Sequence, residues 1–370
     1  MILKNRTEIN KFQSGFNKLI GLYFKTNNKV FAGILEDRVK KMNLINNPDY
    51  FNPEKVLVDL YKILREKVEN NDQNKKQVQL NEFIFSNFKD QGQEYKVINN
   101  LSKVFKKYPE IVKSSILHGS FATKDFSRDF SDLDLQIILN DDVFSHPDKL
   151  KFAKKILFRH SLLCYRVDIL THHEFMFLTE FDLENYSQGL LPLEVYEESL
   201  ILSGEKIIGF SVKKTPEIIS EKLKRTLGLF LDHKIAFNKY SVSPFDYKNA
   251  LANLIIIPSL VLGYLENSVY KRDSFSKIIE LYPEFNREAI EIASQERKNW
   301  KQFNILKAIP LFCFKFLPIN FIRILIRINK KFLKTIFIFK NKSKMKDFFV
   351  SAEVFSKQIY NKFFYNNEIL

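Results

Sequence analysis

Two stretches of sequence decide the fold of this chain, ILHGSFAT at residues 116–123 and FSDLDLQIIL at residues 130–139. The first is a short apolar run that leads into Gly119 and Ser120, and the second is an apolar run that contains Asp132 and Asp134. Side chains at positions i and i+2 of a strand lie on the same face of a sheet. The spacing therefore predicts a strand from which both aspartates project together.

These residue types at this spacing indicate a site for a metal ion and a phosphate. Two carboxylates held this close repel each other unless a positive charge lies between them. Mg²⁺ prefers oxygen ligands and keeps coordination positions for phosphate oxygens. Gly119 allows the backbone to approach a phosphate closely, and Ser120 offers a hydroxyl and an N–H group. The pattern predicts phosphoryl or nucleotidyl transfer by metal-assisted in-line displacement.

At these residues the chain resembles the DNA polymerase beta superfamily of nucleotidyltransferases. That family has Gly-Ser, then Asp-x-Asp on the next strand, and a third carboxylate on a later strand after a helix. The apolar stretch LLCYRVDIL at residues 162–170 supplies the third acid, Asp168, and is expected to be that strand. The segment between, residues 146–160, has the apolar spacing of a helix.

The resemblance implies a role for each of these residues. Asp132 and Asp134 would hold two Mg²⁺ ions, and Asp168 would ligate the metal nearest the acceptor and help to deprotonate the acceptor hydroxyl. Gly119 and Ser120 would bind the β- and γ-phosphates of a nucleoside triphosphate (NTP). The protein would then be an enzyme that moves a nucleoside monophosphate (NMP) to an acceptor and releases pyrophosphate.

A basic pair in YKRDSFSK, residues 270–277, precedes an expected helix start. In relatives with a helical second domain, a lysine in such a place reaches the triphosphate, a role that suits a mobile point charge. Lys271 is the candidate for this role. The alternative is an ordinary solvated loop lysine.

Several kinds of acceptor for the NMP group are compatible with the sequence. The short interval between Asp134 and Asp168 leaves little room for the insertions of polymerising relatives, and this favours one transfer to a small molecule, a sugar-like or lipid-linked acceptor, or a protein. Two alternatives are an RNA-directed nucleotidyltransferase and a catalytically inactive nucleotide-binding regulatory module. A further alternative is that these acids are turn and strand-end residues of an ordinary sheet.

The expected fold class is α+β, a polymerase-beta-like mixed sheet with helices, flanked by helical regions at both ends. At 370 residues the chain is long enough for two or three domains. Four parts are expected: an N-terminal helical region over residues 1–92, a catalytic domain over 93–212, a helical domain over 213–300 and a basic amphipathic segment over 301–370.

Local signals predict several individual elements. Asn52-Pro53 has the residues of a capped helix start, and helices are also expected over residues 93–108 and over 250–265, with a kink or break at Pro258. Residues 69–76 are polar and predict a linker, and residues 193–204 predict a helix followed by a short strand. His172 and His173 are expected at a polar strand end, because a zinc site would need more ligands nearby.

The C-terminal part carries much of the net charge of +15, since no Asp or Glu lies between Arg297 and Lys346. A helix over residues 321–334 would place Arg323, Arg327, Lys330 or Lys331, and Lys334 along one face of an otherwise apolar surface. Three interpretations follow: a core helix with snorkelling basic side chains, peripheral contact with an anionic membrane through residues 301–346, and a nucleic-acid-binding face.

Cysteine content and the N-terminus bear on location. Cys164 and Cys313 both lie in apolar runs, which provides no disulfide framework and fits a reducing cytosol. The N-terminal residues lack the long apolar core of a signal peptide. We therefore expect a cytoplasmic protein, with peripheral membrane association as an extension.

Overall fold

The computed structural model describes residues 6–26, 28–42, 48–50, 52–67, 75–171, 174–187, 191–213, 216–314, 316–340 and 342–365. The chain begins with three helices, α1 (Arg6–Lys25), α2 (Asn28–Met42) and α3 (Pro53–Lys67). At the start of α3 the Asn52 side chain accepts a hydrogen bond of 3.2 Å from the backbone N–H of Lys55. The predicted capped helix start is confirmed.

The central sheet has five strands in the order β2 (Asn81–Glu82), β7 (Leu200–Gly204), β3 (Val112–Leu117), β4 (Leu135–Leu139) and β5 (Phe175–Leu178). Strand β3 is antiparallel to both neighbours, whereas β4 pairs with β5 and β7 with β2 in parallel. The middle strands β3 and β4 are almost wholly buried. A mixed sheet with helices is the architecture that the resemblance predicts, and the α+β fold class is confirmed.

A second, smaller sheet has the order β1 (Lys75–Gln79), β8 (Ile207–Lys213) and β6 (Tyr186–Ser187). Because β1 and β2 are strands, the prediction that residues 1–92 are helical is wrong for residues 75–82, and the last two residues of the predicted linker belong to β1. The sequence of β1 has one buried apolar side chain, Val78, which pairs with Ile208 of β8. The strand forms because β8 supplies its hydrogen-bond ladder, and a local pattern does not record such a partner.

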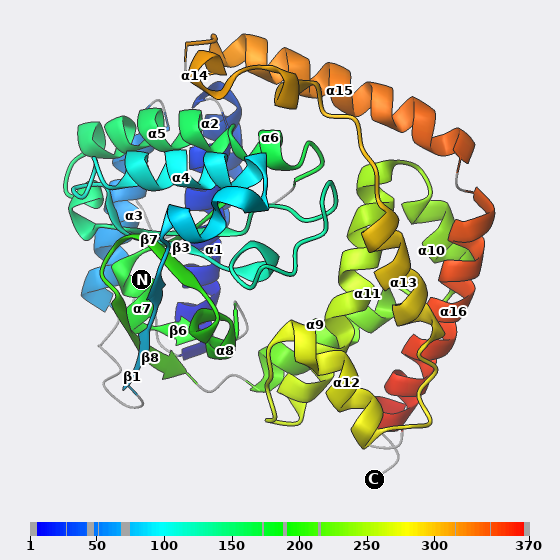
Figure 1. Ribbon diagram of the computed structural model, residues 1–370. Helices are drawn as coiled ribbons and strands as arrows, with labels where there is room; N and C mark the ends of the chain where they lie inside the picture. The colour runs from blue at the N-terminus through cyan, green and yellow to red at the C-terminus, as the bar shows by residue number, and fades with distance from the viewer. Residues whose placement is uncertain are drawn as a thin grey trace.

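Helices cover the central sheet. The predicted helices at 93–108 and 146–160 are confirmed as α4 (Gln93–Phe105) and α5 (Pro147–Ser161), and both lie above the sheet in Figure 1. The short α6 (Cys164–Val167) follows α5, and α1 packs on α5 and β5. The remaining short elements are η1 (Phe85–Gln91), η2 (Gly119–Phe121), η3 (Asp141–Phe144), α7 (Glu180–Glu184) and α8 (Leu193–Glu197). With β7 after α8, the predicted helix and strand at residues 193–204 are confirmed.

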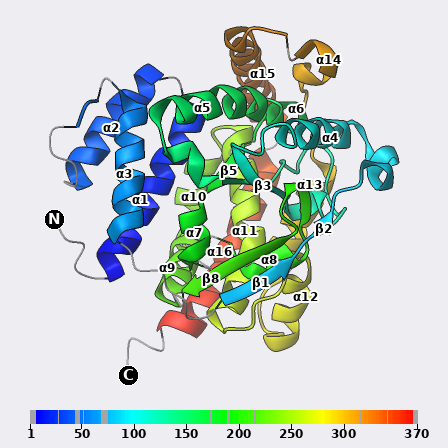
Figure 2. The same ribbon diagram turned by 90° about the vertical axis from the view of Figure 1, so that its left-hand side faces the viewer.

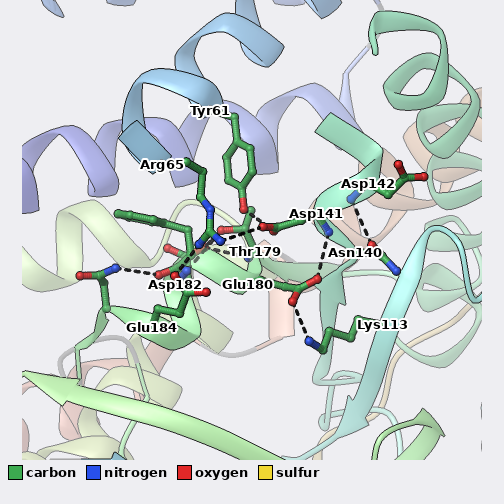
Figure 3. Close-up of polar contacts among 12 residues, drawn as sticks. Tyr61, Arg65, Lys113, Asn140, Asp141, Asp142, Thr179, Glu180, Asp182 and Glu184 are labelled. Carbon is green, nitrogen blue, oxygen red and sulfur yellow. Dashed lines mark hydrogen bonds and ion pairs between the residues drawn. The ribbon is translucent and has the colours of Figure 1, made fainter. Parts of the chain in front are cut away.

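Polar contacts attach the N-terminal helices to this body (Figure 3). On α3, Tyr61 donates a hydrogen bond to the carboxylate of Asp141, and Arg65 pairs with Glu184. The carboxylate of Asp182 accepts hydrogen bonds from two amide side chains of α1. Helices α1–α3 also form one side of the molecule in Figure 2. The first part of the chain is therefore attached, through side chains of η3 and α7, to the part that contains the central sheet.

The second half of the chain is a helical bundle around α11 (Pro244–Tyr264), which contacts α9 (Pro216–Gly228), α10 (His233–Tyr240), α12 (Lys271–Leu281) and α13 (Glu288–Asn299). Helix α16 (Lys342–Tyr360) returns to pack on α9, α10 and α13 and continues into η5 (Asn361–Tyr365). Pro258 lies inside α11 and the helix continues past it, so the break considered at this proline does not occur.

The segment between α13 and α16 leaves the bundle. It forms η4 (Ile305–Ala308), α14 (Leu311–Phe314) and the long α15 (Ile319–Lys340). In Figures 1 and 2, α14 and α15 lie along the upper edge of the molecule. Among the helices that the structure describes, none combines the length and the apolar character needed to cross a bilayer.

Candidate active site

The Gly-Ser turn lies directly on one of the two paired aspartates. Gly119 opens η2 with a φ angle of +69°, a conformation that favours glycine. A Cβ atom at this position would lie 2.4 Å from Oδ2 of Asp134, so any other residue would collide with the carboxylate. The backbone N–H of His118 also donates a hydrogen bond of 3.1 Å to the carbonyl of Asp134. The sequence motif is thus a physical contact between the end of β3 and the start of β4.

Asp132 and Asp134 precede β4, which begins at Leu135. The prediction that they lie within the strand is wrong by this small offset, but their relative orientation is as expected. Ser131, Leu133 and Leu135 are buried, whereas both aspartates are partly exposed. The alternation shows that the two carboxylates point to the same side of an extended segment.

The two carboxylates act strongly on each other. Burial raises the pKa of Asp134 well above its ordinary value, and the neighbouring Asp132 raises it further. Three cations from the helical bundle oppose the shift: Lys271, Lys248 and Arg297. In the part of the chain that the structure describes, the Asp134 carboxylate makes no hydrogen bond or ion pair of its own. It is a partly buried charge that a bound cation would stabilise.

The predicted strand at residues 162–170 is wrong. This stretch ends α5, forms the helix α6 and leaves Asp168 as a single extended residue after it. The strand that pairs in parallel with β4 is the later β5. An apolar run of this length fits a buried helix as well as a strand, and periodicity alone does not separate the two.

Asp168 is nevertheless brought to the site. Its side chain is fully buried and accepts hydrogen bonds from Gln302 (2.8 Å), from the backbone N–H of Leu170 (3.0 Å), and from Lys248 on α11. Burial raises its pKa, the Lys248 ammonium lowers it, and Asp132 raises it again. The third acid is therefore in electrostatic contact with Asp132 and is held by the helical bundle.

Lys271 lies within electrostatic range of the aspartate pair. It is the first residue of α12 and its side chain is exposed to solvent. The surrounding protein lowers its pKa by desolvation and Arg297 lowers it further, whereas Asp134, Asp132 and Asp125 raise it. The neighbouring Tyr270 hydrogen-bonds Thr123, just after the Gly-Ser turn. The start of α12 is thus attached beside the proposed phosphate site.

Sequence reasoning missed three residues that act on the carboxylates: Lys248, Arg297 and Gln302. A signal existed for Lys248, which is the only charged residue from Tyr247 to Leu265. A lysine in such an apolar stretch, only 5% exposed as a side chain here, is rarely buried without a partner. No comparable signal marks Gln302, which reaches Asp168 from 134 residues away.

The three aspartates differ in how well they fit a bound metal ion. Asp132 and Asp134 offer carboxylate oxygens on one side of the chain, which fits a divalent cation of the Mg²⁺ type. The oxygens of Asp168 are already engaged by Lys248 and Gln302. Consistent with this, among the described residues no three His, Cys, Asp or Glu side chains lie close enough together to hold a metal. His172 and His173 lie outside the described residues.

Comparison with known families identifies this part of the chain. Residues 98–190 match the family model of the nucleotidyltransferase domain. This segment is a nucleotidyltransferase domain. It contains the Gly-Ser turn and all three aspartates, and the match confirms the resemblance to the polymerase beta superfamily. Neither the curated proteins nor the solved structures provide a match to the chain.

The match also bears on activity. A nucleotidyltransferase domain supports NMP transfer in general, with an NTP as the substrate. It supports a transferase of the nucleotidyl-transferring class.

Proposed function

We propose that the chain is a nucleotidyltransferase that moves an NMP from an NTP to an acceptor hydroxyl by two-metal catalysis and releases pyrophosphate. One observation carries the proposal: the Gly119 turn is pressed against the Asp134 carboxylate, while Asp132 acts on both Asp134 and Asp168. Residues from separate parts of the sequence thus meet in the arrangement that phosphate binding beside paired carboxylates requires.

Asp132 and Asp134 would hold Mg²⁺. When bound, the metal would neutralise charge on the triphosphate and activate the acceptor oxygen. The protein's own contribution is to keep two carboxylates on one side of the chain at the cost of a raised pKa for Asp134. Such mutual repulsion is typical of a site built for a cation rather than for the free carboxylates.

Asp168 would act on the acceptor. Burial raises the pKa of Asp168, and the Lys248 ammonium opposes this shift by favouring the ionised carboxylate, which can accept the proton of the acceptor hydroxyl. The acceptor oxygen then forms a bond to the α-phosphorus, the bond to the β-phosphate oxygen breaks, and pyrophosphate leaves with that electron pair. For Asp168 also to ligate a metal, Lys248 or Gln302 would have to release one of its oxygens.

Gly119, Ser120 and Lys271 would bind the phosphates. The turn would offer backbone N–H groups and a hydroxyl, and Lys271, the first residue of α12 in the helical bundle, would add a positive charge. The acceptor is proposed to be a small molecule, a sugar-like or lipid-linked compound, or a protein, since residues 135–167 between the acids form β4, η3, α5 and α6 without further insertions.

The test is transfer of label from an α-phosphate-labelled NTP to a cell extract in the presence of Mg²⁺, together with pyrophosphate release. The wild type and Asp148→Asn, which removes an exposed acid on α5, should both transfer label. Asp132→Asn and Asp134→Asn should not. Tight Mg²⁺-dependent NTP binding by the wild type with no pyrophosphate release would instead favour the inactive nucleotide-binding module.

A further inference from the structure

Helix α15 is attached to the rest of the protein by a narrow face. Its buried side chains are Ile322, Ile326, Asn329 and Leu333, which recur at helical spacing. Asn329 fixes this face: its amide donates a hydrogen bond of 2.8 Å to the carbonyl of Phe303 and accepts one of 2.8 Å from the N–H of Ile305. The interpretation of this segment as a core helix therefore holds for one strip of its surface only.

Large apolar side chains lie on the solvent side of the same helix. Five of them are between 41% and 56% exposed: Phe321, Ile324, Ile328, Phe332 and Ile336. At 3.6 residues per turn they fall within one sector beside the buried strip. We call these five residues the apolar stripe. Phe303, which is 56% exposed and contacts the ring of Phe332, and Phe312 of α14, which is 69% exposed, extend the apolar surface around it.

Basic side chains occupy the remaining sector of α15. Arg327, Lys331 and Lys334 are exposed, and Arg323 lies half-buried in the same sector. We call the three exposed residues the basic row. No acidic residue occurs between Arg297 and Lys346, so neither α14 nor α15 carries an acid that could offset this charge. The surface of α15 away from the body is thus divided lengthwise into an apolar half and a cationic half.

The presence of both an apolar and a cationic half on α15 indicates which kind of partner binds this surface. A second copy of the chain would bring the same cationic row with it, and the two rows would repel. A nucleic acid would neutralise the basic row, but it would leave Ile324, Ile328 and Ile336 in water, because base stacking uses aromatic platforms. An anionic bilayer satisfies both halves, since acyl chains accept the apolar side chains and anionic headgroups accept the basic ones.

We propose that α15, with α14 beside it, docks the protein on an anionic lipid bilayer, with the apolar stripe at the acyl boundary and the basic row among the headgroups. Both helices lie at the upper edge of the molecule in Figure 1, so a flat surface can reach them. The helix lies on the membrane and does not cross it. The proposal does not depend on the nucleotidyl transfer proposed above.

The test is co-sedimentation of the full-length protein with vesicles. The wild type is expected to pellet with vesicles of phosphatidylcholine and phosphatidylglycerol in low salt. It should bind vesicles of phosphatidylcholine alone far more weakly. Binding to the anionic vesicles should weaken as salt rises, because salt screens the basic row.

Two variants separate the two halves of the surface. Arg327→Gln/Lys331→Gln/Lys334→Gln should weaken binding about 100-fold, at roughly five-fold per charge near the membrane. Its control, Lys103→Gln/Lys106→Gln/Lys107→Gln, removes the same charge from exposed positions in and just after α4 and should bind nearly as well as the wild type. Phe321→Ser/Ile328→Ser/Phe332→Ser should weaken binding at least about ten-fold at every salt concentration. Its control is Ile207→Ser/Ile235→Ser/Val242→Ser, at exposed positions on other elements.

Three results would overturn the proposal. The first is a wild type that ignores anionic vesicles in low salt. The second is equal loss of binding in a basic-row variant and its charge-matched control, which would show a diffuse attraction by net charge. The third is a change of oligomeric state, or a loss of RNA binding, on substitution of the stripe while vesicle binding is unchanged. That result would assign the surface to a second copy or to a nucleic acid.

Discussion

The nucleotidyltransferase domain has clusters of carboxylates in two places. The two clusters differ in how far hydrogen-bond donors and cations offset the negative charge. The first place is the junction with the N-terminal helices, where Asp141, Glu180, Asp182 and Glu184 lie in η3 and α7 (Figure 3). We call these four residues the junction acids. The second is the candidate active site, with Asp132, Asp134 and Asp168.

Each of the junction acids has a donor from another element. Tyr61 donates to Asp141, Arg65 pairs with Glu184, Lys113 pairs with Glu180 at 2.6 Å, and Gln13 and Asn17 each donate to Asp182 at 2.8 Å. Burial raises the pKa of Asp141, but Tyr61 and then Arg65 oppose the shift. Asp141, Asp182 and Glu184 attach α1 and α3 to η3 and α7, and Glu180 attaches α7 to β3. These acids are structural.

The site acids instead act on one another. Asp132 raises the pKa of both Asp134 and Asp168. Asp168 also pairs with a cation, Lys248, that comes from the helical bundle. A matched cluster stabilises the fold, whereas a cluster left with excess negative charge is suited to bind a cation. The comparison predicts opposite effects of substitution in the two places.

The largest effect is expected for activity. Asp134→Asn should lower nucleotidyl transfer by at least about 1,000-fold, because several kcal/mol of stabilisation from the metal would be lost. Its free energy of unfolding in urea should be unchanged or higher, since the substitution removes a partly buried charge whose pKa is raised. Activity retained in this variant would place the chemistry elsewhere.

The next effect concerns the ion pair that joins the two regions of the chain. Lys248→Met should lower the free energy of unfolding by about 3–5 kcal/mol, because it leaves Asp168 buried without its cation. The double variant Lys248→Met/Asp168→Asn should recover part of this loss. If the single variant is as stable as the wild type, the contact contributes nothing to holding α11 on the domain.

At the junction, Asp182→Ala should destabilise the fold by about 3 kcal/mol, because it removes the carboxylate that accepts hydrogen bonds from the amides of Gln13 and Asn17 and from the N–H of Thr179. Transfer activity per folded molecule should be unchanged. The exposed Asp148→Ala serves as the control and should change stability by no more than about 0.5 kcal/mol. A loss of activity without a loss of stability would contradict the structural role.

The smallest effect tests a matched acid outside the domain. Glu353 of α16 accepts hydrogen bonds from Lys357 and from the N–H of His233 (2.7 Å), which lower its pKa to about 2. Because this pKa is lower than that of the unfolded chain, the ionised carboxylate stabilises the fold at pH values above the unfolded pKa. This stabilisation is lost as the pH falls towards 2. Glu353→Gln should therefore cost about 1 kcal/mol at pH 7. In urea unfolding series the difference should shrink between pH 5 and pH 2, and a constant difference would exclude the ionic origin.

Much of the fold was predictable where the signal is local. The helices α3, α4 and α5 follow from caps and apolar periodicity over a few turns. The strands β1 and β2 were not predictable, because each depends on a partner strand far along the chain. The helical state of residues 164–167 was not predictable, because a short apolar run fits a buried helix as well as a strand. At the candidate site, spacing alone was enough to single out Gly119, Ser120, Asp132 and Asp134 as candidates. The pairing of Lys248 and Gln302 with Asp168 was not predictable, because these residues meet Asp168 from 80 and 134 residues away.

The sequence by itself determined that a Gly-Ser turn and an Asp-x-Asp pair occur in a nucleotidyltransferase-like order, because these residues are close together and the backbone geometry between them is short-range. It also determined that α15 is both basic and apolar. Only the tertiary structure decided that Lys248 holds Asp168, that four acids of the junction are matched, and that the apolar stripe of α15 remains in solvent. Charge matching and exposure depend on which distant side chains come together, and no local pattern encodes that.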